Sequence, residues 1–587
     1  MNSSRSLAST RFGAAFYAWL RARWTARPAL HSDVALALAA SLAWAVLYNL
    51  QFWDQAIRAM WHPTPGAVLF LVSLFVLVVF VQALLLALVP TRLGLRVAAS
   101  ASFVVAALGS YFASAYGAVM NQDMMRNVIE TDPAEVGGLI NFDLLAHVVL
   151  LGAIPAILVW RIRLPSSSWR VRLRQRLVFI GSALALCAVA LFACSSNYAV
   201  FFREHKPVRY SLSPAAPILS MAGVLSARER DPHAPLINVA GNVQRTVASG
   251  RKPLVLFLVV GETARAADFQ LGGYARATNP RLEGVPGLVY FDHATSCGTS
   301  TAISVPCMFS HLPRARFDVE QADRYTNLLD SLQKAGLAVE WRDNNAGCKG
   351  VCARVVETSY PGESDRVHCP NSYCYDEVML SDLPARLDAL EHDTVVVFHA
   401  IGSHGPAYAA RYPPQFETFK PACRSNELQR CSNEEIVNAY DNSIAYTDYI
   451  LSRQIELLQA RADRFDSLLL YASDHGESLG EQGIYLHGMP YSFAPSVQKE
   501  VPMLFWASPG YVERSGLSMG CMRTHAHDAV SHDNVYHTVL GALGVQDAVY
   551  DPALDLLAGC RAATPQLSDG RHSLQDPIAF VANQRLK

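Results

Sequence analysis

Charge is scarce in this chain of 587 residues: charged residues make up 17% of it and hydrophobic residues 51%. The net charge is −1, and no basic cluster lies outside the loops that flank its long apolar stretches. Nucleic-acid-binding proteins normally concentrate positive charge on one surface, so this composition argues against that class. The chain also has no internal repeat and no low-complexity tract, which argues against a repeat architecture.

The apolar residues are concentrated before residue 200. A helix of about 20 residues crosses the hydrocarbon core of a bilayer, which is about 30 Å thick. Stretches of suitable length lie at about 33–53, 66–89, 95–118, 143–160 and 177–196. The first is too long, and followed by too many others, to be a cleavable signal peptide. The sequence therefore predicts a transmembrane anchor of five helices over residues 1–200.

Acidic residues are absent before the first span, whereas arginines are frequent there. Arginines also fill the second-to-third and fourth-to-fifth loops, while the other two loops are acidic or nearly neutral. The positive-inside rule then places the N-terminus in the cytoplasm. An odd number of spans puts everything beyond residue 200 on the other side of the membrane.

Cysteine is absent from the first 186 residues. Cys187 and Cys194 lie in the fifth span, and the other ten cysteines all lie beyond residue 290. An even set of cysteines in an exported domain indicates disulfides. The spacings group them as Cys297/Cys307, Cys348/Cys352, Cys369/Cys374, Cys423/Cys431 and Cys521/Cys560. The alternative is a structural zinc site, because the second and third pairs have an imperfect zinc-ribbon spacing.

The exported half begins with a connection rich in proline and serine, over 201–250, which we interpret as an interfacial linker. Beyond it, continuous apolar runs at 253–260, 394–398 and 467–472 are typical of strands buried on both faces. Helical patterns lie between them, at about 322–336 and 433–460. This alternation predicts an α/β domain over 251–587, with a mainly parallel sheet covered by helices on both faces.

Polar groups follow each of the three apolar runs: Glu262 after the first, His404 after the second, and Asp474 with His475 after the third. Ligands bind beyond the carboxyl ends of such strands, so we expect these side chains to lie close together. Taken singly, each has an ordinary explanation as a helix cap, a turn residue or a packed histidine. Together with the hydroxyl of Thr301, they form a set that can bind zinc and make the alcohol a nucleophile.

The motifs of the exported half closely resemble those of the phosphoethanolamine transferases that modify bacterial lipid A, a family that includes the mobile colistin-resistance enzymes. The resemblance covers most of residues 250–535, and a five-span anchor is also typical of the family. The matching segments are GETARA at 261–266, GYxR at 273–276, SCGTST at 296–301, VPCMF at 305–309, WRDNN at 341–345, HGP at 404–406 and SDHGESLGE at 473–481. The pair Cys521/Cys560 has no place in this pattern.

The resemblance implies a periplasmic domain with an alkaline-phosphatase/sulfatase-like fold and a set of site residues. It places the zinc ligands on Glu262, Thr301, Asp474 and His475, with Thr301 also as the nucleophile. Two further histidines, His404 and His487, match residues around the substrate phosphate that in the family sometimes hold a second zinc. Positions linked to phosphoethanolamine binding in the family are matched by Thr299, Asn345 and Lys349.

The implied activity is transfer of phosphoethanolamine from phosphatidylethanolamine to a phosphate of lipid A, through a covalent intermediate on Thr301. Such an enzyme would be a multi-pass monomer of the bacterial inner membrane and would confer tolerance to polymyxins. An alternative is transfer of phosphoethanolamine or phosphoglycerol to another envelope glycan, either the core oligosaccharide or a periplasmic glucan.

Three other classes are less compatible with the sequence. An arylsulfatase-like hydrolase would need an arginine after the segment 304–307, which is absent. A non-enzymatic membrane sensor would have lost ligands that are all present here. A transporter would carry a charged relay residue at mid-depth in a span, and none is found; His147 lies near the start of its span.

Overall fold

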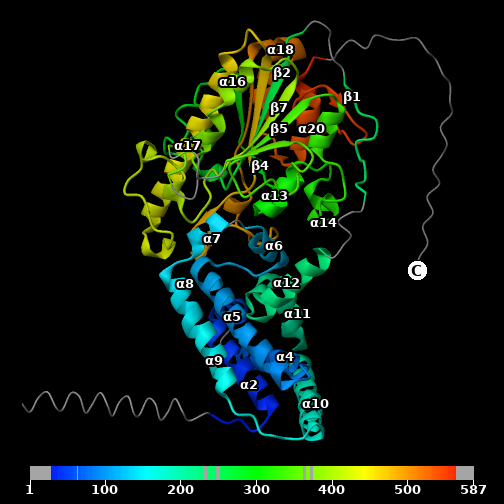
Figure 1. Ribbon diagram of the computed structural model, residues 1–587, viewed down its shortest axis with the longest axis vertical. Helices are drawn as coiled ribbons and strands as arrows, with labels where there is room; N and C mark the ends of the chain where they lie inside the picture. Colours follow the sequence, from blue (N-terminus) through cyan, green and yellow to red (C-terminus); the bar gives the residue numbers. More distant parts are fainter. Residues whose placement is uncertain are drawn as a thin grey trace, which may run out of the picture.

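The computed structural model describes residues 28–562, apart from 62–63, 132, 229–234, 246–250, 361–364, 366 and 371–373. It shows an elongated molecule with a bundle of apolar helices at one end and an α/β domain at the other (Figure 1). The arginines expected before the first span, and the last 25 residues of the predicted catalytic domain, lie outside the described part of the chain.

Among the described residues, four helices are long and apolar enough to cross a membrane. They are α4 (Pro65–Ala87), α5 (Arg92–Tyr116), α10 (Trp169–Ala193) and the run Phe142–Arg161, which comprises α8 (Phe142–His147), a π-helical turn and α9 (Ile154–Arg161). These agree with four of the five predicted spans.

The first predicted span is broken. The helix Asp33–Tyr48, which starts as α2 (Asp33–Ala43), bends by 69° into α3 (Leu50–Met60). The bend lies at Asn49, whose Nδ2 donates hydrogen bonds to the carbonyls of Trp44, at 2.8 Å, and Ser213, at 2.7 Å. A polar side chain that satisfies backbone carbonyls allows a helix to break inside an apolar bundle. The anchor thus has five spans only if this bent pair counts as one.

The predicted linker begins as helix rather than as irregular chain. After α11 (Ser195–Glu204) and a 3₁₀ turn, α12 (Ala215–Arg228) packs against α6 (Gln122–Glu130), a short helix that follows α5. Pro207 lies in the first turn of the 3₁₀ segment and Pro214 directly precedes α12, where the missing N–H is not needed.

The α/β domain is built on a seven-stranded sheet. Its order is β3 (Leu288–Phe291), β11 (Met503–Ala507), β8 (Asp466–Ser473), β2 (Leu254–Gly261), β7 (Thr394–His399), β5 (Ala338–Asp343) and β6 (Val356–Ser359). The three predicted apolar runs form the neighbouring central strands β8, β2 and β7, which are parallel and buried along their whole length. The antiparallel strands β11 and β3 complete one edge.

Helices cover both faces of the sheet, as the alternating pattern predicts (Figure 1). One core contains Leu256 and Leu258 and lies under α13 (Thr301–Met308), α15 (Leu328–Lys334) and α20 (Asp533–Ala542). The other contains Phe257 and Val259 and lies under α16 (Leu383–Asp388) and the long α17 (Asn433–Gln459). The helix expected at 433–460 is confirmed, whereas that at 322–336 is shorter because it starts only at the capping box of Asn327 and Asp330.

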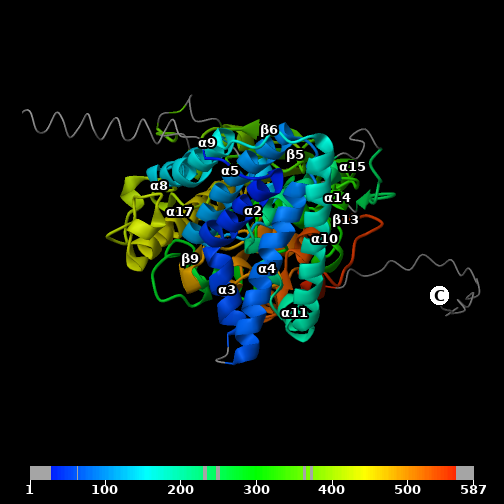
Figure 2. The ribbon, with the colours of Figure 1, turned by 90° about the horizontal axis from the view of Figure 1, so that it is seen from below.

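The α/β domain rests on the ends of the membrane helices, which lie beneath it in Figure 1 and in front of it in the view from below (Figure 2). Arg126 of α6 forms an ion pair of 3.4 Å with Glu320, and Asn426 Nδ2 donates to the carbonyl of Gly138 at 3.0 Å. Helix α6 also contacts α13. The carboxyl ends of the central strands therefore face the membrane helices.

Candidate metal centre and active site

Three ligand side chains meet at the carboxyl ends of β2 and β8. Glu262 follows β2, and Asp474 and His475 follow β8; the paired register of Gly261 with Ser473 sets them side by side. All three are buried, and their ligand atoms lie within 4.8 Å of one another. Two of the three polar strand ends of the prediction therefore meet in this cluster.

Thr301 joins this cluster from the first position of α13. Its Oγ1 lies 3.1 Å from Glu262 Oε2 and 3.4 Å from His475 Nε2. The preceding Ser300 holds the N-cap position but makes no side-chain capping hydrogen bond. The hydroxyl of Thr301 thus faces the carboxylate and the imidazole, at a helix N-terminus that favours negative charge.

The cluster has the chemistry of a cation site. His475 Nδ1 lies 2.9 Å from the carbonyl of Gly476, to which it can only donate, so its Nε2 presents a lone pair. His475 Nε2 lies 3.4 Å from Glu262 Oε1 and 3.3 Å from Asp474 Oδ2. Asp474 Oδ2 accepts no hydrogen bond from the described residues. Burial and the neighbouring Glu262 raise the pKa of Asp474, while burial and His487 lower the pKa of His475. Buried acceptors that face one another need a cation, and two carboxylates, an imidazole and an alcohol suit zinc.

Two more histidines line the same centre. The ring of His487 lies 4.3 Å from that of His475 and 5.4 Å from that of His404, between centroids. Burial opposes protonation of His487, but Glu477 Oε2, 3.3 Å from its Nδ1, raises its pKa overall. A histidine that keeps its proton can donate to a bound phosphate.

Three residues expected to bind phosphoethanolamine are anchored in different ways. Asn345 Nδ2 donates to Glu262 Oε2, at 2.7 Å, and to the carbonyl of Ala400, at 2.9 Å, so it orients a predicted metal ligand. Thr299 Oγ1 donates to the carbonyl of Met489, at 2.5 Å, and thereby holds the loop that carries His487.

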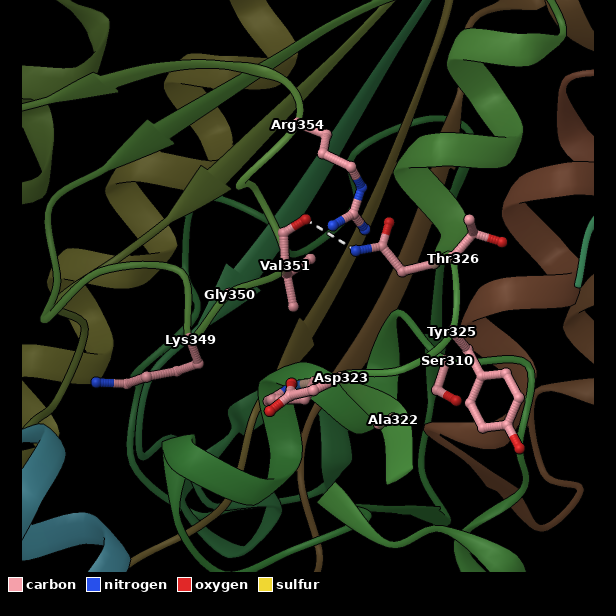
Figure 3. Close-up of a pocket in the computed structure, with 11 residues that line it drawn as sticks. Ser310, Ala322, Asp323, Tyr325, Thr326, Lys349, Gly350, Val351 and Arg354 are labelled. Atoms are coloured by element: carbon pink, nitrogen blue, oxygen red, sulfur yellow. Dashed lines mark hydrogen bonds between the residues drawn. The ribbon is translucent and has the colours of Figure 1, made fainter. Parts of the chain in front are cut away.

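Lys349 is directed toward the membrane domain. Its Nζ donates to the carbonyls of Ala346, at 2.8 Å, and of Glu130 in α6, at 3.2 Å. In Figure 3 it lies at the edge of a polar cavity lined by Asp323, Arg354 and their neighbours, and its ammonium points away from that cavity. Contact between Lys349 and a substrate remains a prediction.

Sequence reasoning assigned no role to several buried polar residues around the cluster. One is Glu477, which stands in the same motif as Asp474 and is fully buried beside His487. Asp343 and His399 are register partners at the ends of β5 and β7 and lie 3.0 Å apart. Burial opposes ionisation of Asp343, yet His399 and several hydrogen bonds lower its pKa to about 2. The signal for this pair was partial, because His399 directly follows the predicted strand 394–398, whereas no strand was predicted before Asp343.

A glycine allows the turn after β7 to approach Glu262 closely. Gly402 adopts a φ of +48°, and a Cβ there would lie 2.6 Å from the carbonyl oxygen of Glu262. The neighbouring Ser403 N–H donates to that same carbonyl at 3.0 Å. A side chain at this position would push the carboxylate out of the cluster.

All five predicted cysteine pairs are disulfides, including Cys521–Cys560. The zinc-ribbon alternative is therefore wrong, because Cys348–Cys352 and Cys369–Cys374 use the sulfurs that it would need. Cys297–Cys307 brackets α13 and thus the threonine. Cys187 and Cys194 are unpaired and buried in or beside the last span.

Comparison with known proteins covers both halves of the chain. Residues 255–545 match the sulfatase family model, and residues 77–228 match the model for phosphoethanolamine transferase EptA/EptB. The chain is 40% identical over 550 residues to phosphoethanolamine transferase EptA of Salmonella typhimurium, covering 92% of this chain and 99% of the relative. It is 37% identical over 495 residues to phosphatidylethanolamine transferase Mcr-1 of Escherichia coli, covering 82% and 90%.

A solved structure matches the whole architecture. The integral membrane protein lipooligosaccharide phosphoethanolamine transferase A of Neisseria meningitidis superposes with a TM-score of 0.88 at 33% identity, covering 91% of this chain and 100% of that chain. The similarity thus includes the helical bundle, the α/β domain and their arrangement.

Proposed function

Because this chain belongs to the phosphoethanolamine transferase EptA/EptB family, we propose that it transfers phosphoethanolamine from phosphatidylethanolamine to a phosphate of lipid A. The observation that carries this proposal is the hydroxyl of Thr301 in contact with Glu262 and His475, in a site that faces the membrane helices. Both substrates are lipids, so a catalytic domain seated on a membrane anchor suits them. The names of relatives mention phosphatidylethanolamine, phosphoethanolamine and a lipooligosaccharide, which supports the donor, the transferred group and the class of acceptor.

The metal proposed for this site is a zinc ion held by Glu262, Thr301, Asp474 and His475. When bound, zinc supplies positive charge that stabilises a deprotonated alcohol and a phosphoryl group. Asn345 keeps Glu262 in place for this role, and the carbonyl of Gly476 keeps His475 in the required tautomer.

The reaction proceeds in two displacements at phosphorus. In the donor step, Thr301 Oγ1 forms a bond to phosphorus, the bond to the glycerol oxygen breaks, and diacylglycerol leaves with the proton given up by the hydroxyl. In the acceptor step, an oxygen of a lipid A phosphate bonds to phosphorus, the bond to Thr301 Oγ1 breaks, and the hydroxyl regains the proton that the acceptor phosphate gives up. His404 and His487 donate hydrogen bonds to the phosphoryl oxygens in both steps.

We further propose that the protein acts as a monomer in the inner membrane, with the α/β domain in the periplasm. The donor then lies in the outer leaflet of the same membrane. The orientation follows from the arginine-rich loops and from five disulfides in the α/β domain, which need an oxidising compartment.

Mass spectrometry of lipid A from cells with and without the expressed chain tests the proposal. We expect lipid A species that carry added phosphoethanolamine only when the chain is expressed. Unmodified lipid A together with a modified core oligosaccharide or periplasmic glucan would instead assign the acceptor to another envelope glycan.

Metal removal tests the zinc assignment. We expect a chelator to stop release of diacylglycerol from phosphatidylethanolamine vesicles, and added zinc to restore it. Full activity in protein shown by elemental analysis to contain no zinc would overturn this assignment.

A further inference from the structure

His532 is a buried histidine that the reaction described above does not use. It is 1% exposed and occupies the N-cap position of α20. Its backbone N–H donates to the carbonyl of Thr295, at 3.0 Å, directly after the short parallel pairing of β12 (Val530–Ser531) with β4 (Ala294–Thr295). The main chain of His532 is thus joined to the start of the loop that leads to Thr301.

The ring of His532 connects two segments of the active site. Its Nδ1 accepts from the N–H of Cys297, at 3.1 Å, and its Nε2 donates to the carbonyl of Ser473, at 2.9 Å. Cys297 begins the loop that carries the nucleophile, and Ser473 immediately precedes Asp474. Residues 176 positions apart along the chain are therefore held together by one imidazole.

The two partners of the ring are themselves firmly placed. The carbonyl of Cys297 accepts from Arg314 Nε at 3.0 Å, and the sulfur of Cys297 is bonded to Cys307 at the far end of α13. Ser473 Oγ accepts from the N–H of Ala264, at 2.8 Å, and donates to the carbonyl of His475, at 3.0 Å. A shift of the ring would therefore move the nucleophile relative to the metal-binding turn.

The two hydrogen bonds of the His532 ring also persist at physiological pH. The two hydrogen bonds require the neutral tautomer with its proton on Nε2. Burial lowers the pKa of His532 to about 4, so the ring keeps its acceptor nitrogen under physiological conditions.

We propose that His532 is a positioning residue, which sets the distance between the hydroxyl of Thr301 and the turn that bears Asp474 and His475. It acts through the backbone of Cys297 and Ser473 and touches neither substrate nor metal. This inference rests on the proposed function, because its effect is read in the transfer reaction. A buried histidine that served only to fill the core would not affect that reaction once the protein had folded.

The test uses the full-length protein in detergent with vesicles of phosphatidylethanolamine, and follows single-turnover release of diacylglycerol. His532→Phe keeps an aromatic ring but removes both hydrogen bonds, and a misplacement of about 1 Å can cost about 100-fold in rate. We expect a loss of about that size in the rate constant, with a KM for the donor changed by less than about twofold. The zinc content of the variant should equal that of the wild type.

His532→Gln supplies an acceptor and a donor near the positions of the two ring nitrogens. We expect it to recover the rate to within about tenfold of the wild type. His537→Phe is the matched control. His537 lies in the same helix, is 2% exposed and accepts a hydrogen bond from the N–H of Asp551 at 3.0 Å, far from the reacting groups. This control should keep the wild-type rate even if its melting temperature falls.

Three results would overturn the proposal: a wild-type rate in His532→Phe, equal losses in His532→Phe and His532→Gln, or a loss that added zinc fully restores. If His532→Phe does not accumulate, Arg314→Met removes the donor to the carbonyl of Cys297 from a partly exposed position. That variant should slow the rate constant at unchanged KM, and an unchanged rate constant would likewise overturn the proposal. Failure of the wild type itself to release diacylglycerol would count against the proposed function instead.

Discussion

At the scale of single residues, the position of the Thr301 hydroxyl decides what the site can do. It lies between a carboxylate and an imidazole that both face it with lone pairs, 3.1 and 3.4 Å away. The neighbouring Thr299 belongs to the same motif, yet its hydroxyl is used to hold the carbonyl of Met489. The two threonines of this motif, Thr299 and Thr301, thus face different partners: the first holds a loop, and the second is the proposed nucleophile.

Replacement of Thr301 by Ala is expected to lower transfer by at least about 1,000-fold, because it removes the hydroxyl proposed to carry the phosphoethanolamine. The melting temperature should change little, since only a small side chain is trimmed. Release of diacylglycerol from vesicles measures the effect. Thr299→Ala should lose far less activity, and near-wild-type transfer in Thr301→Ala would refute the assignment of the nucleophile.

Asp448 gives a prediction about pH. This carboxyl on α17 is buried and accepts hydrogen bonds from the N–H groups of Arg281 and Leu282, both at 3.0 Å. Burial raises its pKa to about 7 despite these donors. Between the ordinary carboxyl pKa of about 4 and pH 7 the folded state therefore binds more protons than the unfolded state, so stability falls as pH rises through this window.

Asp448→Asn removes this titration. Melting temperatures of the wild type and the variant, recorded from pH 4 to pH 8, should show the wild type losing stability relative to the variant up to about pH 7 and a constant difference above it. A difference that does not change with pH across this window would show that Asp448 is ionised in the folded protein.

At the scale of elements, the short helix α13 depends on covalent and hydrogen-bonded support at both ends. The disulfide Cys297–Cys307 spans it, and the loop before it is held by the backbone pairing of β4 and β12. A helix of eight residues has little stability of its own, so its orientation comes from these tertiary contacts.

Removal of this disulfide should affect both stability and rate. In the chain-entropy picture, a bridge with a separation of 10 residues contributes about 3 kcal/mol to the free energy of unfolding. We expect the double variant Cys297→Ser/Cys307→Ser to melt at a lower temperature and, where folded, to transfer more slowly.

The bridge Cys521–Cys560 is the control for this experiment. Its separation of 39 residues predicts a larger stability loss, of about 4 kcal/mol, but it lies away from α13. Its double serine variant should therefore keep the wild-type rate at temperatures where it is folded. Equal rate losses in both variants would show that the first bridge has no specific effect on the nucleophile.

At the scale of the whole molecule, the active site lies between the sheet and the membrane helices. Lys349 reaches the carbonyl of Glu130 in α6, and Arg126 of the same helix pairs with Glu320. The anchor therefore contributes to the surroundings of the site as well as holding the domain at the bilayer. This arrangement suits two substrates whose headgroups emerge from a membrane.

The cellular consequence follows from charge. Lipid A phosphates attract cationic peptides through several Coulomb contacts, and each added phosphoethanolamine places an ammonium beside a phosphate. Expression should therefore raise the minimum inhibitory concentration of polymyxin, whereas the Thr301→Ala protein should not. Lipid A mass spectra from the same cells provide the check. Unchanged tolerance with phosphoethanolamine on another glycan would move the acceptor away from lipid A.

Much of this protein could be predicted from sequence because the information is local. Apolar length indicates the membrane helices. Continuous apolar runs indicate β2, β7 and β8, because strands buried on both faces carry apolar residues at successive positions. Polar residues directly after parallel strands must converge at one edge of the sheet, which is why Glu262, Asp474 and His475 could be grouped.

The remaining features depend on packing between segments that are distant in sequence. Asn49, at the bend, donates a hydrogen bond to the carbonyl of Ser213. The hydrogen bond from Asn345 to Glu262 depends on the register of β5 with β7. The ring of His532 is hydrogen-bonded to both Cys297 and Ser473. Propensity and spacing carry no information about such pairings, because each contact is specified only when both partners have been placed by the fold. The sequence by itself identified the candidate groups for the chemistry, because motifs are local, and the tertiary structure decided how those groups are held.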